Sequence, residues 1–237
     1  MRLDERLSLA YDLYETCALA ADIGTDHGYL PLALLSGGKC ERMILTDVSP
    51  DALNNARGHF ALSGLEDRAD LRLGDGLTPL TEECGMISVL GMGGKTIRDI
   101  LLRGRDRIRG ARLLLSAHTD LPEVRSAVAE LGYHLTKEEP CRAAGRYYLI
   151  MKAEPGAESL TEEEIRRGKR VTESESPALA GYLAHRLKAE EAQLRGLRAA
   201  PRAEPSALAR AEADAAFYRS ALKAAEGRRA GKTGQKD

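Results

Sequence analysis

The strongest constraint on the fold is a short stretch near the start of the chain, Asp22-Ile23-Gly24-Thr25-Asp26-His27-Gly28-Tyr29-Leu30-Pro31. It follows Leu19-Ala20-Ala21, which are apolar residues without a polar interruption. This order predicts a buried strand over 18–24, a glycine turn and then a helix. Such a turn presents free backbone N–H groups at the carboxyl edge of a parallel sheet, where ligands bind.

Strand and helix patterns alternate after this turn. Helices are predicted over 3–16, 29–36, 50–63, 95–102 and 121–131, and further strands over 42–47, 69–73, 86–90 and 111–116. Two last strands, 133–138 and 147–153, follow one another without a helix between them. This pattern predicts an α/β fold with a mostly parallel, doubly wound sheet and one antiparallel hairpin at its edge. That ending fits class I methyltransferases better than dehydrogenases.

The helix after the second strand carries clear start signals. Ser49-Pro50-Asp51 places a cap residue, a proline in the first turn and an acid at the positive end of the helix dipole. Leu53, Ala56 and Phe60 share one face of this helix. We therefore expect these three side chains to face the core.

The composition changes near Pro155-Gly156, after which no strand pattern occurs. Apolar residues recur at helical spacing over 179–197 and in steps of three and four over 208–225, on either side of Pro201 and Pro205. This pattern predicts two antiparallel helices that form a coiled-coil hairpin. The predicted division is a sheet domain over 1–154, a helical hairpin over 155–228 and a disordered tail over 229–237, which is rich in glycine and basic residues.

Bulk properties exclude several classes of protein. The formal net charge is −1, so no global attraction to nucleic acid or membrane exists. The N-terminus is not a signal peptide, and no apolar run approaches the length of a membrane span. The four cysteines form no C-x-x-C pair, which favours reduced thiols over a metal site or a disulfide framework. We expect a cytoplasmic protein without a metal.

The glycine turn itself indicates the kind of ligand. The nicotinamide fingerprint is G-x-G-x-x-G, but here Asp26 stands where its middle glycine would be, between Gly24 and Gly28. An aspartate there would face a pyrophosphate unfavourably. It is compatible with a cationic sulfonium-and-amine ligand such as S-adenosylmethionine. The sequence therefore favours a methyl donor over a dinucleotide.

Acids and glycines follow the next three strands as well. Asp47 is placed to accept ribose hydroxyls, Asp75 to accept from an adenine amine, and Gly91-Met92-Gly93-Gly94 to lie beside the donor's methyl group. Each also has an ordinary alternative as a helix cap, a turn or a packing glycine. The candidate cofactor-binding residues are Asp22, Gly24, Thr25, His27, Gly28, Asp47, Val48, Asp75, Gly76, Gly91, Met92 and Gly93.

The segments DIGTDHGYLP, TDVSPDALNNA, GDGL, GMGG and GRYYLIMKAEPG together resemble the bacterial tRNA adenine-N1-methyltransferase family. Leu3, Arg6 and Leu7 are similar to the family's L-x-x-R-L opening. The resemblance covers essentially the whole chain and implies methylation of the adenine at tRNA position 22, with S-adenosylmethionine as donor. The chain departs from the family at Ser116-Ala117-His118, where some relatives carry a Q-P-N or S-P-Q type segment, and at Leu90, which replaces a small residue.

This reaction suggests roles for two residues of the turn. The adenine N1 lone pair is already nucleophilic, and the methylated base becomes cationic, so a nearby carboxylate stabilises the transition state. Asp26 is the first candidate for that catalytic role, with binding of the donor's amino group as the alternative. Tyr29, the second catalytic candidate, either stacks on a base or packs, and His27 either orients Asp26 or caps the helix.

Binding to tRNA also requires contacts with phosphates. The candidate RNA-binding residues are Arg2, Arg6, Arg166 and Arg167. Basic clusters over 98–112 and 166–170 are either RNA contacts or solvated surface, and the hairpin is either a tRNA clamp or a dimerising or stabilising coiled coil. We expect a monomer or a weak dimer. The alternatives to a tRNA methyltransferase are a methyltransferase for a small molecule or protein, and a non-catalytic scaffold that binds the donor or RNA.

Overall fold

The computed structural model describes residues 3–233. Arg2 and residues 234–237, which include part of the predicted tail, lie outside the described residues. The chain forms two compact units. The first contains the chain up to Glu138 together with Tyr148–Arg170, and the second contains Glu139–Tyr147 together with the chain from Val171 onward. Each unit is described by itself below.

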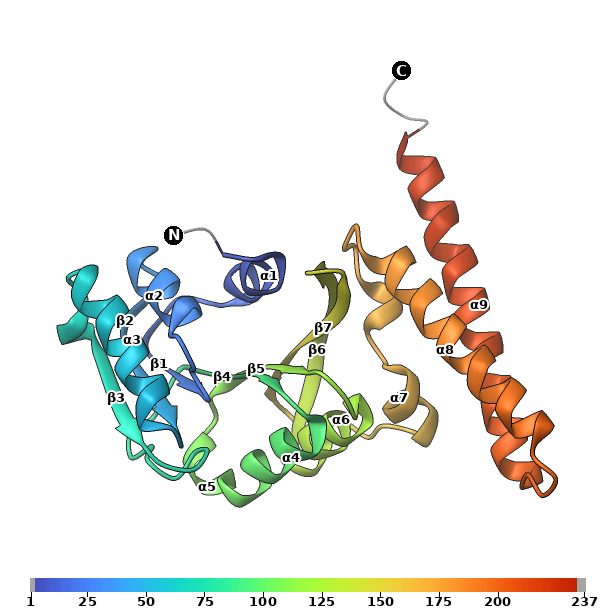
Figure 1. Cartoon of the computed structure of the whole chain (residues 1–237), viewed down its shortest axis with the longest axis horizontal. Helices are drawn as coiled ribbons and strands as arrows, with labels where there is room; N and C mark the ends of the chain where they lie inside the picture. The colour runs from blue at the N-terminus through green and yellow to red at the C-terminus, as the bar shows by residue number, and fades with distance from the viewer. Residues whose placement is uncertain (1–2, 234–237) are drawn as a thin grey trace. The chain divides into compact units, whose positions relative to one another are not determined.

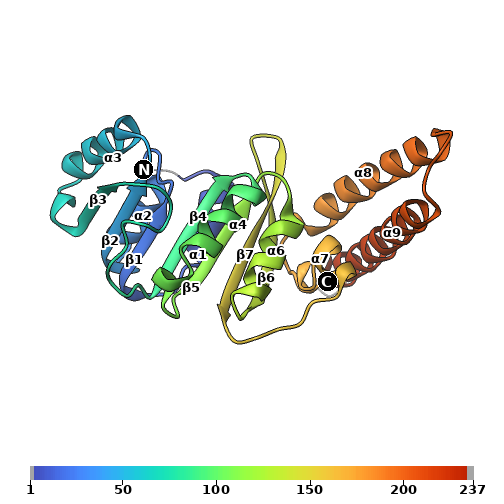
Figure 2. The ribbon, with the colours of Figure 1, turned by 90° about the horizontal axis from the view of Figure 1, so that it is seen from below.

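A single mixed sheet contains all seven strands, and only the adjoining ends of β6 and β7 belong to the second unit (Figure 2). Its strands are β1 (Cys17–Ile23), β2 (Cys40–Asp47), β3 (Ala69–Leu73), β4 (Met86–Met92), β5 (Arg112–Ala117), β6 (Tyr133–Ala143) and β7 (Arg146–Pro155). They lie in the order β3-β2-β1-β4-β5-β7-β6. Strands β1 to β5 pair in parallel, whereas β7 pairs antiparallel with β5. The predicted parallel sheet with an antiparallel hairpin at its edge is confirmed.

Helices cover both faces of this sheet, as Figure 1 shows. They are α1 (Glu5–Leu13), α2 (Tyr29–Ser36), α3 (Pro50–Leu62), α4 (Gly94–Arg103), α5 (Arg105–Ile108), α6 (Leu121–Glu130) and α7 (Glu162–Arg167), with a 3-10 turn η1 (Glu66–Arg68). The helices α1 and α2 lie on one face and α4 and α6 on the other. No predicted helix corresponds to α5 or α7, because each is too short to show a periodic pattern. Among residues 3–233, no helix is long and apolar enough to cross a membrane.

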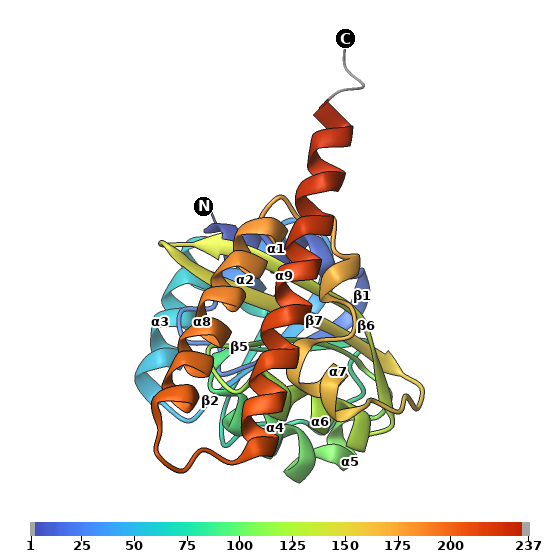
Figure 3. The same ribbon diagram turned by 90° about the vertical axis from the view of Figure 1, so that its right-hand side faces the viewer.

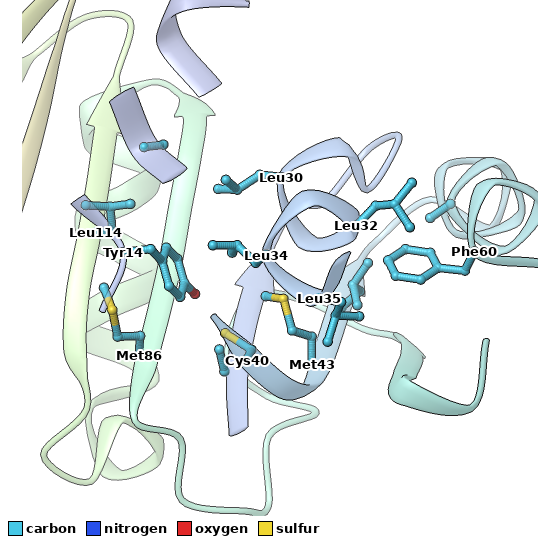
Figure 4. Packing of buried hydrophobic residues seen from close by; sticks show 14 of the residues in the cluster. Tyr14, Leu30, Leu32, Leu34, Leu35, Cys40, Met43, Phe60, Met86 and Leu114 are labelled. Carbon is cyan, nitrogen blue, oxygen red and sulfur yellow. The ribbon is translucent and has the colours of Figure 1, made fainter. Parts of the chain in front are cut away.

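The core beneath α2 and α3 forms as the sequence predicts. Ser49 caps α3 by accepting a hydrogen bond from the backbone N–H of Ala52 at 3.3 Å. Leu53, Ala56 and Phe60 are the buried residues of α3, which confirms the predicted inner face. Figure 4 shows the ring of Phe60 packed in the same cluster as the leucines of α2 and the methionine of β2. This cluster fixes the two helices whose N-termini flank the glycine turn.

The first unit extends to Arg170, beyond the predicted boundary at residue 154. A buried ion pair accounts for this extension: Nε of Arg125 on α6 lies 2.7 Å from Oε1 of Glu138 on β6, with both side chains at most 1% exposed. Nη1 of Arg125 also donates to the carbonyl of Ile165 at 2.9 Å, and Oε2 of Glu138 accepts from the backbone N–H of Arg170 at 2.8 Å. These bonds hold the segment around α7 to α6 and β6.

The second unit contains the predicted helical hairpin, which Figures 1 and 3 show as two helices side by side. It consists of α8 (Leu179–Ala199) and α9 (Pro205–Thr233), preceded by a 3-10 turn η2 (Val171–Glu173). Ion pairs at 2.7 Å join Arg198 to Glu212 and Arg219 to Glu191 across the two helices. The helix α9 continues to Thr233, into the region 229–237 that the sequence predicts as a disordered tail.

Candidate active site

The turn between β1 and α2 requires glycine at two positions. Gly24 has φ +72° and Gly28, the N-cap residue of α2, has φ +67°, and L residues with a side chain rarely adopt such angles. A Cβ atom at Gly24 would lie 2.0 Å from Cε of Met92 at the end of β4. The backbone N–H of Gly24 donates to the carbonyl of Thr46 at 2.8 Å. The ends of β1, β2 and β4 are therefore brought together at this turn.

Asp47, at the end of β2, faces the same turn. Its Oδ2 accepts from the backbone N–H of Asp26 at 3.4 Å, and its Oδ1 accepts from the backbone N–H of Ser49 at 2.8 Å. Asp26 has φ +50°, an unusual angle for a residue other than glycine. A carboxylate thus holds an N–H group that a bound phosphate would need. This geometry disfavours a pyrophosphate ligand at the turn.

Two polar side chains are buried beneath the turn. Asp22 is 6% exposed, and its Oδ1 accepts from Oγ of Ser88 on β4 at 2.6 Å. Burial raises the pKa of Asp22, while the hydrogen bond from Ser88 opposes the rise. The hydroxyl of Thr25, which is 7% exposed, lies close enough to Asp22 to lower its pKa but makes no hydrogen bond of normal geometry. A buried hydroxyl of this kind is available to a polar ligand.

The two catalytic candidates, Asp26 and Tyr29, lie beside the rings of His27 and His59. The side chain of Asp26 is 73% exposed, and its Oδ2 lies 3.7 Å from Nε2 of His27. The ring of Tyr29 contacts the rings of His27 and His59 at centroid distances of 5.3 Å and 5.0 Å, and the His27 and His59 rings lie 6.3 Å from each other, so the three rings form a triangle. His59 comes from α3 and also contacts the carbonyl of His27 through Nδ1 at 2.9 Å. Gly28 and not His27 is the N-cap of α2, and the His27 side chain lies near Asp26, which it is predicted to orient.

The end of β3 lies beside Asp47. The predicted adenine-binding turn, Gly74-Asp75-Gly76, begins at this end of β3. The backbone N–H of Gly74 donates to the carbonyl of Asp47 at 3.0 Å, and Oγ1 of Thr46 donates to the carbonyl of Gly76 at 3.1 Å. Asp75 is exposed and forms an ion pair with Arg103 at 2.8 Å. Val48 is 68% exposed at the same edge. The structure therefore places Val48, Asp75 and Gly76 at the carboxyl edge of the sheet, with Asp75 already paired.

Strand β4 continues to Met92, beyond its predicted end at residue 90. An irregularity in its pairing with β5 falls between Leu90 and Met92, and Gly91 has φ +82°. Gly93 is the N-cap of α4, so the glycines open this helix after the strand. A Cβ atom at Gly91 would lie 3.2 Å from Nη1 of Arg6 and 3.8 Å from Nε2 of His118. Arg6 therefore reaches the predicted cofactor edge from α1.

The other predicted RNA-binding arginines lie elsewhere. Arg166 and Arg167 are at the end of α7, where Arg167 pairs with Glu163 at 3.5 Å. Most arginines of the basic cluster over 98–112 bind groups of the protein itself. Arg98 pairs with Glu123, Arg103 with Asp75 and Arg112 with Glu15, while Arg107 and Arg109 donate to the carbonyls of Leu80 and Thr81. Most of these guanidinium groups are therefore already bound by groups of the first unit.

The strand order, the antiparallel edge and the acid-lined glycine turn define a Rossmann-like methyltransferase fold rather than a dinucleotide-binding one. A family described as "Methyltransferase domain" matches residues 3–151, which is more than half of the chain. The chain belongs to this methyltransferase-domain family.

Particular relatives extend this likeness. The chain is 30% identical over 158 residues to the tRNA (adenine(22)-N(1))-methyltransferase of Bacillus subtilis (strain 168), and the match covers 66% of each chain, just under two thirds of the relative's length. The solved B. subtilis m1A22 tRNA methyltransferase has a TM-score of 0.81 at 23% identity, covering 93% of this chain and 99% of that one. Sp1610 of Streptococcus pneumoniae, solved with S-adenosyl-L-methionine, has the same TM-score and identity and covers 93% and 100%. These structural likenesses show the fold.

Proposed function

We propose that this protein transfers a methyl group from S-adenosylmethionine to N1 of an adenine in tRNA, at position 22. The relative at 30% identity carries the name of this activity. The observation that carries the choice of donor is the bond from the backbone N–H of Asp26 to the carboxylate of Asp47. A negative group at the mouth of the turn suits a cationic sulfonium and repels a pyrophosphate.

The residues at this edge fit S-adenosylmethionine in three ways. Gly24 leaves room where a side chain would collide with Met92, Thr25 offers a buried hydroxyl with an unmet hydrogen bond, and Asp47 offers a carboxylate. The full proposed binding set is Asp22, Gly24, Thr25, His27, Gly28, Asp47, Val48, Asp75, Gly76, Gly91, Met92 and Gly93. When bound, the donor supplies an electrophilic methyl group.

Asp26 and Tyr29 act on the base in this proposal. Methylation at N1 leaves a positive charge on the adenine, and the exposed carboxylate of Asp26 stabilises that charge as it develops. His27 orients Asp26 through the contact at 3.7 Å. Tyr29 is 39% exposed and contacts the rings of His27 and His59, so its ring is accessible to a base of the RNA.

The hairpin of α8 and α9 serves as a clamp for the tRNA in this proposal. Its own pairing uses Arg198 and Arg219, but Arg195, Arg202 and Arg210 are exposed on it. These side chains supply phosphate contacts that do not depend on sequence, and Arg166 and Arg167 of the first unit supply others. The activity would be exercised in the cytoplasm, where the protein acts as a monomer or a weak dimer.

The test uses the full chain, donor labelled in its methyl group, and unmodified tRNA. We expect label in tRNA, and nuclease mapping should place it on N1 of the adenine at position 22. A matched tRNA with guanosine at that position should take up none. Label in a small metabolite or a protein instead of tRNA, or donor binding by calorimetry without any transfer, would reject the proposal.

A further inference from the structure

Four residues from separate elements meet at the end of β4. They are Arg6 of α1, Gly91 of β4, His118 after β5 and Tyr148 of β7, and we name them the Gly91 cluster. We propose that the Gly91 cluster is the docking site for the target nucleotide, in which Tyr148 stacks on the adenine base and Arg6 binds an adjoining backbone phosphate. This assignment rests on the proposed function.

The three side chains converge on one point. The guanidinium carbon of Arg6 lies 5.5 Å from the centre of the Tyr148 ring, and the His118 ring meets Tyr148 nearly edge-on at 5.8 Å. Nη1 of Arg6 and Nε2 of His118 both approach the α-carbon of Gly91, at 3.2 Å and 3.8 Å from the place of a Cβ atom. Arg6 and Tyr148 are partly exposed and His118 is exposed, so a ligand can reach them.

Arg6 differs in its charge partners from the arginines near the sheet that pair with a carboxylate. Arg98, Arg112 and Arg125 each pair with a carboxylate. Within residues 3–233, Arg6 forms no ion pair, although Asp22 is near enough for Arg6 to lower its pKa. A partly buried guanidinium beside an aromatic ring, with no paired carboxylate, suits a phosphate.

The position of the cluster matches the geometry that methyl transfer requires. The strands β4 and β1 are neighbours, and Met92, the residue next to Gly91, reaches Gly24 on the proposed donor turn. The base must lie beside the donor, so it must lie at the ends of these two strands. Bases taken out of a tRNA stack are received by aromatic side chains, and Tyr148 supplies such a ring. The aromatic face also favours the cationic product.

The cluster gives His118 a role despite its departure from the family's polar segment. Its ring lies edge-on to Tyr148 and so holds the tyrosine ring in place. His118 is therefore a positioning residue for Tyr148 in this proposal. A side chain without a ring at position 118 would leave Tyr148 less well oriented, which should raise KM for tRNA more than it lowers kcat.

The test measures tRNA affinity, donor affinity and methyl transfer for Tyr148→Leu, Tyr148→Phe and Arg6→Gln. Tyr148→Leu should weaken tRNA binding by about 5- to 160-fold, which corresponds to the 1–3 kcal/mol typical of base stacking on an aromatic side chain, while Tyr148→Phe stays near wild type. Arg6→Gln should reduce the slope of log Kd against log salt by about one. The matched control is Arg42→Gln, an exposed arginine near the start of β2, which should leave the slope unchanged.

The outcomes separate this inference from the proposed function. If the wild-type protein does not methylate tRNA, the proposed function fails. If it does, but Tyr148→Leu keeps its tRNA affinity and Arg6→Gln keeps its salt slope, the docking site is wrong and the function stands. A loss of donor affinity equal to the loss of tRNA affinity would also overturn the assignment. Because the Arg6 measurement does not depend on Tyr148, misfolding of one variant leaves the other test intact.

Discussion

Gly24 is the residue whose replacement should most directly report on the geometry of the donor turn. Gly24 has φ +72°, and an alanine in this left-handed region destabilises the folded state by about 1–2 kcal/mol. Its Cβ would also lie 2.0 Å from Cε of Met92, so the thioether must leave its position. Forcing a side chain off its rotamer costs about 0.5–1.5 kcal/mol. We expect Gly24→Ala to lower the free energy of unfolding by about 1.5–3.5 kcal/mol, the sum of these two contributions.

The two contributions can be separated by a double-mutant cycle in urea denaturation. Met92→Ala removes the collision but leaves the backbone angle, so Gly24→Ala should cost only about 1–2 kcal/mol in the Met92→Ala background. The coupling energy between Gly24→Ala and Met92→Ala, which measures the collision, should therefore be about 0.5–1.5 kcal/mol. Donor affinity should fall about tenfold in Gly24→Ala, because the added methyl group and the displaced Met92 both lie at the turn.

Two results would refute this reasoning. A cost below about 0.5 kcal/mol for Gly24→Ala would mean that the turn does not hold this angle in solution. A coupling of zero would mean that Met92 does not approach Gly24. Calorimetric titration of the donor with each variant checks whether the same contacts shape the binding site.

Three further predictions concern the catalytic turn, the core and the thiols. Asp26→Asn should lower kcat for tRNA methylation by about a hundredfold with little change in the donor dissociation constant; an equal loss of donor affinity would assign Asp26 to the donor alone. Glu138→Gln should cost about 3–5 kcal/mol in urea denaturation because it leaves Arg125 buried without its carboxylate, whereas a Leu and Met pair at the two positions should recover most of this loss. Alkylation of Cys17 should reach half its maximal rate near pH 7, because hydrogen bonding from Cys40 lowers the pKa of Cys17 to about 7, against the effect of burial. A rate that rises only above about pH 8 would contradict this, and Cys17→Ser is the control.

The sequence alone predicts much of the local structure. The helix over 29–36 and the strand over 69–73 have the predicted bounds. The cap at Ser49 and the inner face that ends at Phe60 are also confirmed. These features depend on residues within a few positions of one another, where turn chemistry and periodicity act directly. The antiparallel edge was predictable as well, because two strands without a helix between them can only form a hairpin.

Several partners at the site gave no such signal. Asp75, which the sequence predicts to accept from an adenine amine, pairs with Arg103, and Asp47 accepts from the backbone N–H of Asp26. His59, which belongs to α3, stacks on Tyr29. In each case the partners are more than twenty residues apart in the chain, and neither residue type specifies the other. The sequence shows only that acids follow neighbouring strands, and it does not show which group each acid binds.

The class of fold, the glycine turn and the acid that disfavours a pyrophosphate are visible in the sequence, because they depend on backbone angles and charges within short segments. Only the tertiary structure decided that Arg6 and Tyr148 meet over Gly91, and that the first unit extends to Arg170. The first contact depends on strand order and on the packing of α1, which bring residues from distant parts of the first unit to one edge of the sheet. The second depends on the hydrogen bonds of Arg125 and Glu138 to the segment around α7. Contacts of this kind depend on how the whole sheet and its helices pack, and local sequence patterns do not predict that packing.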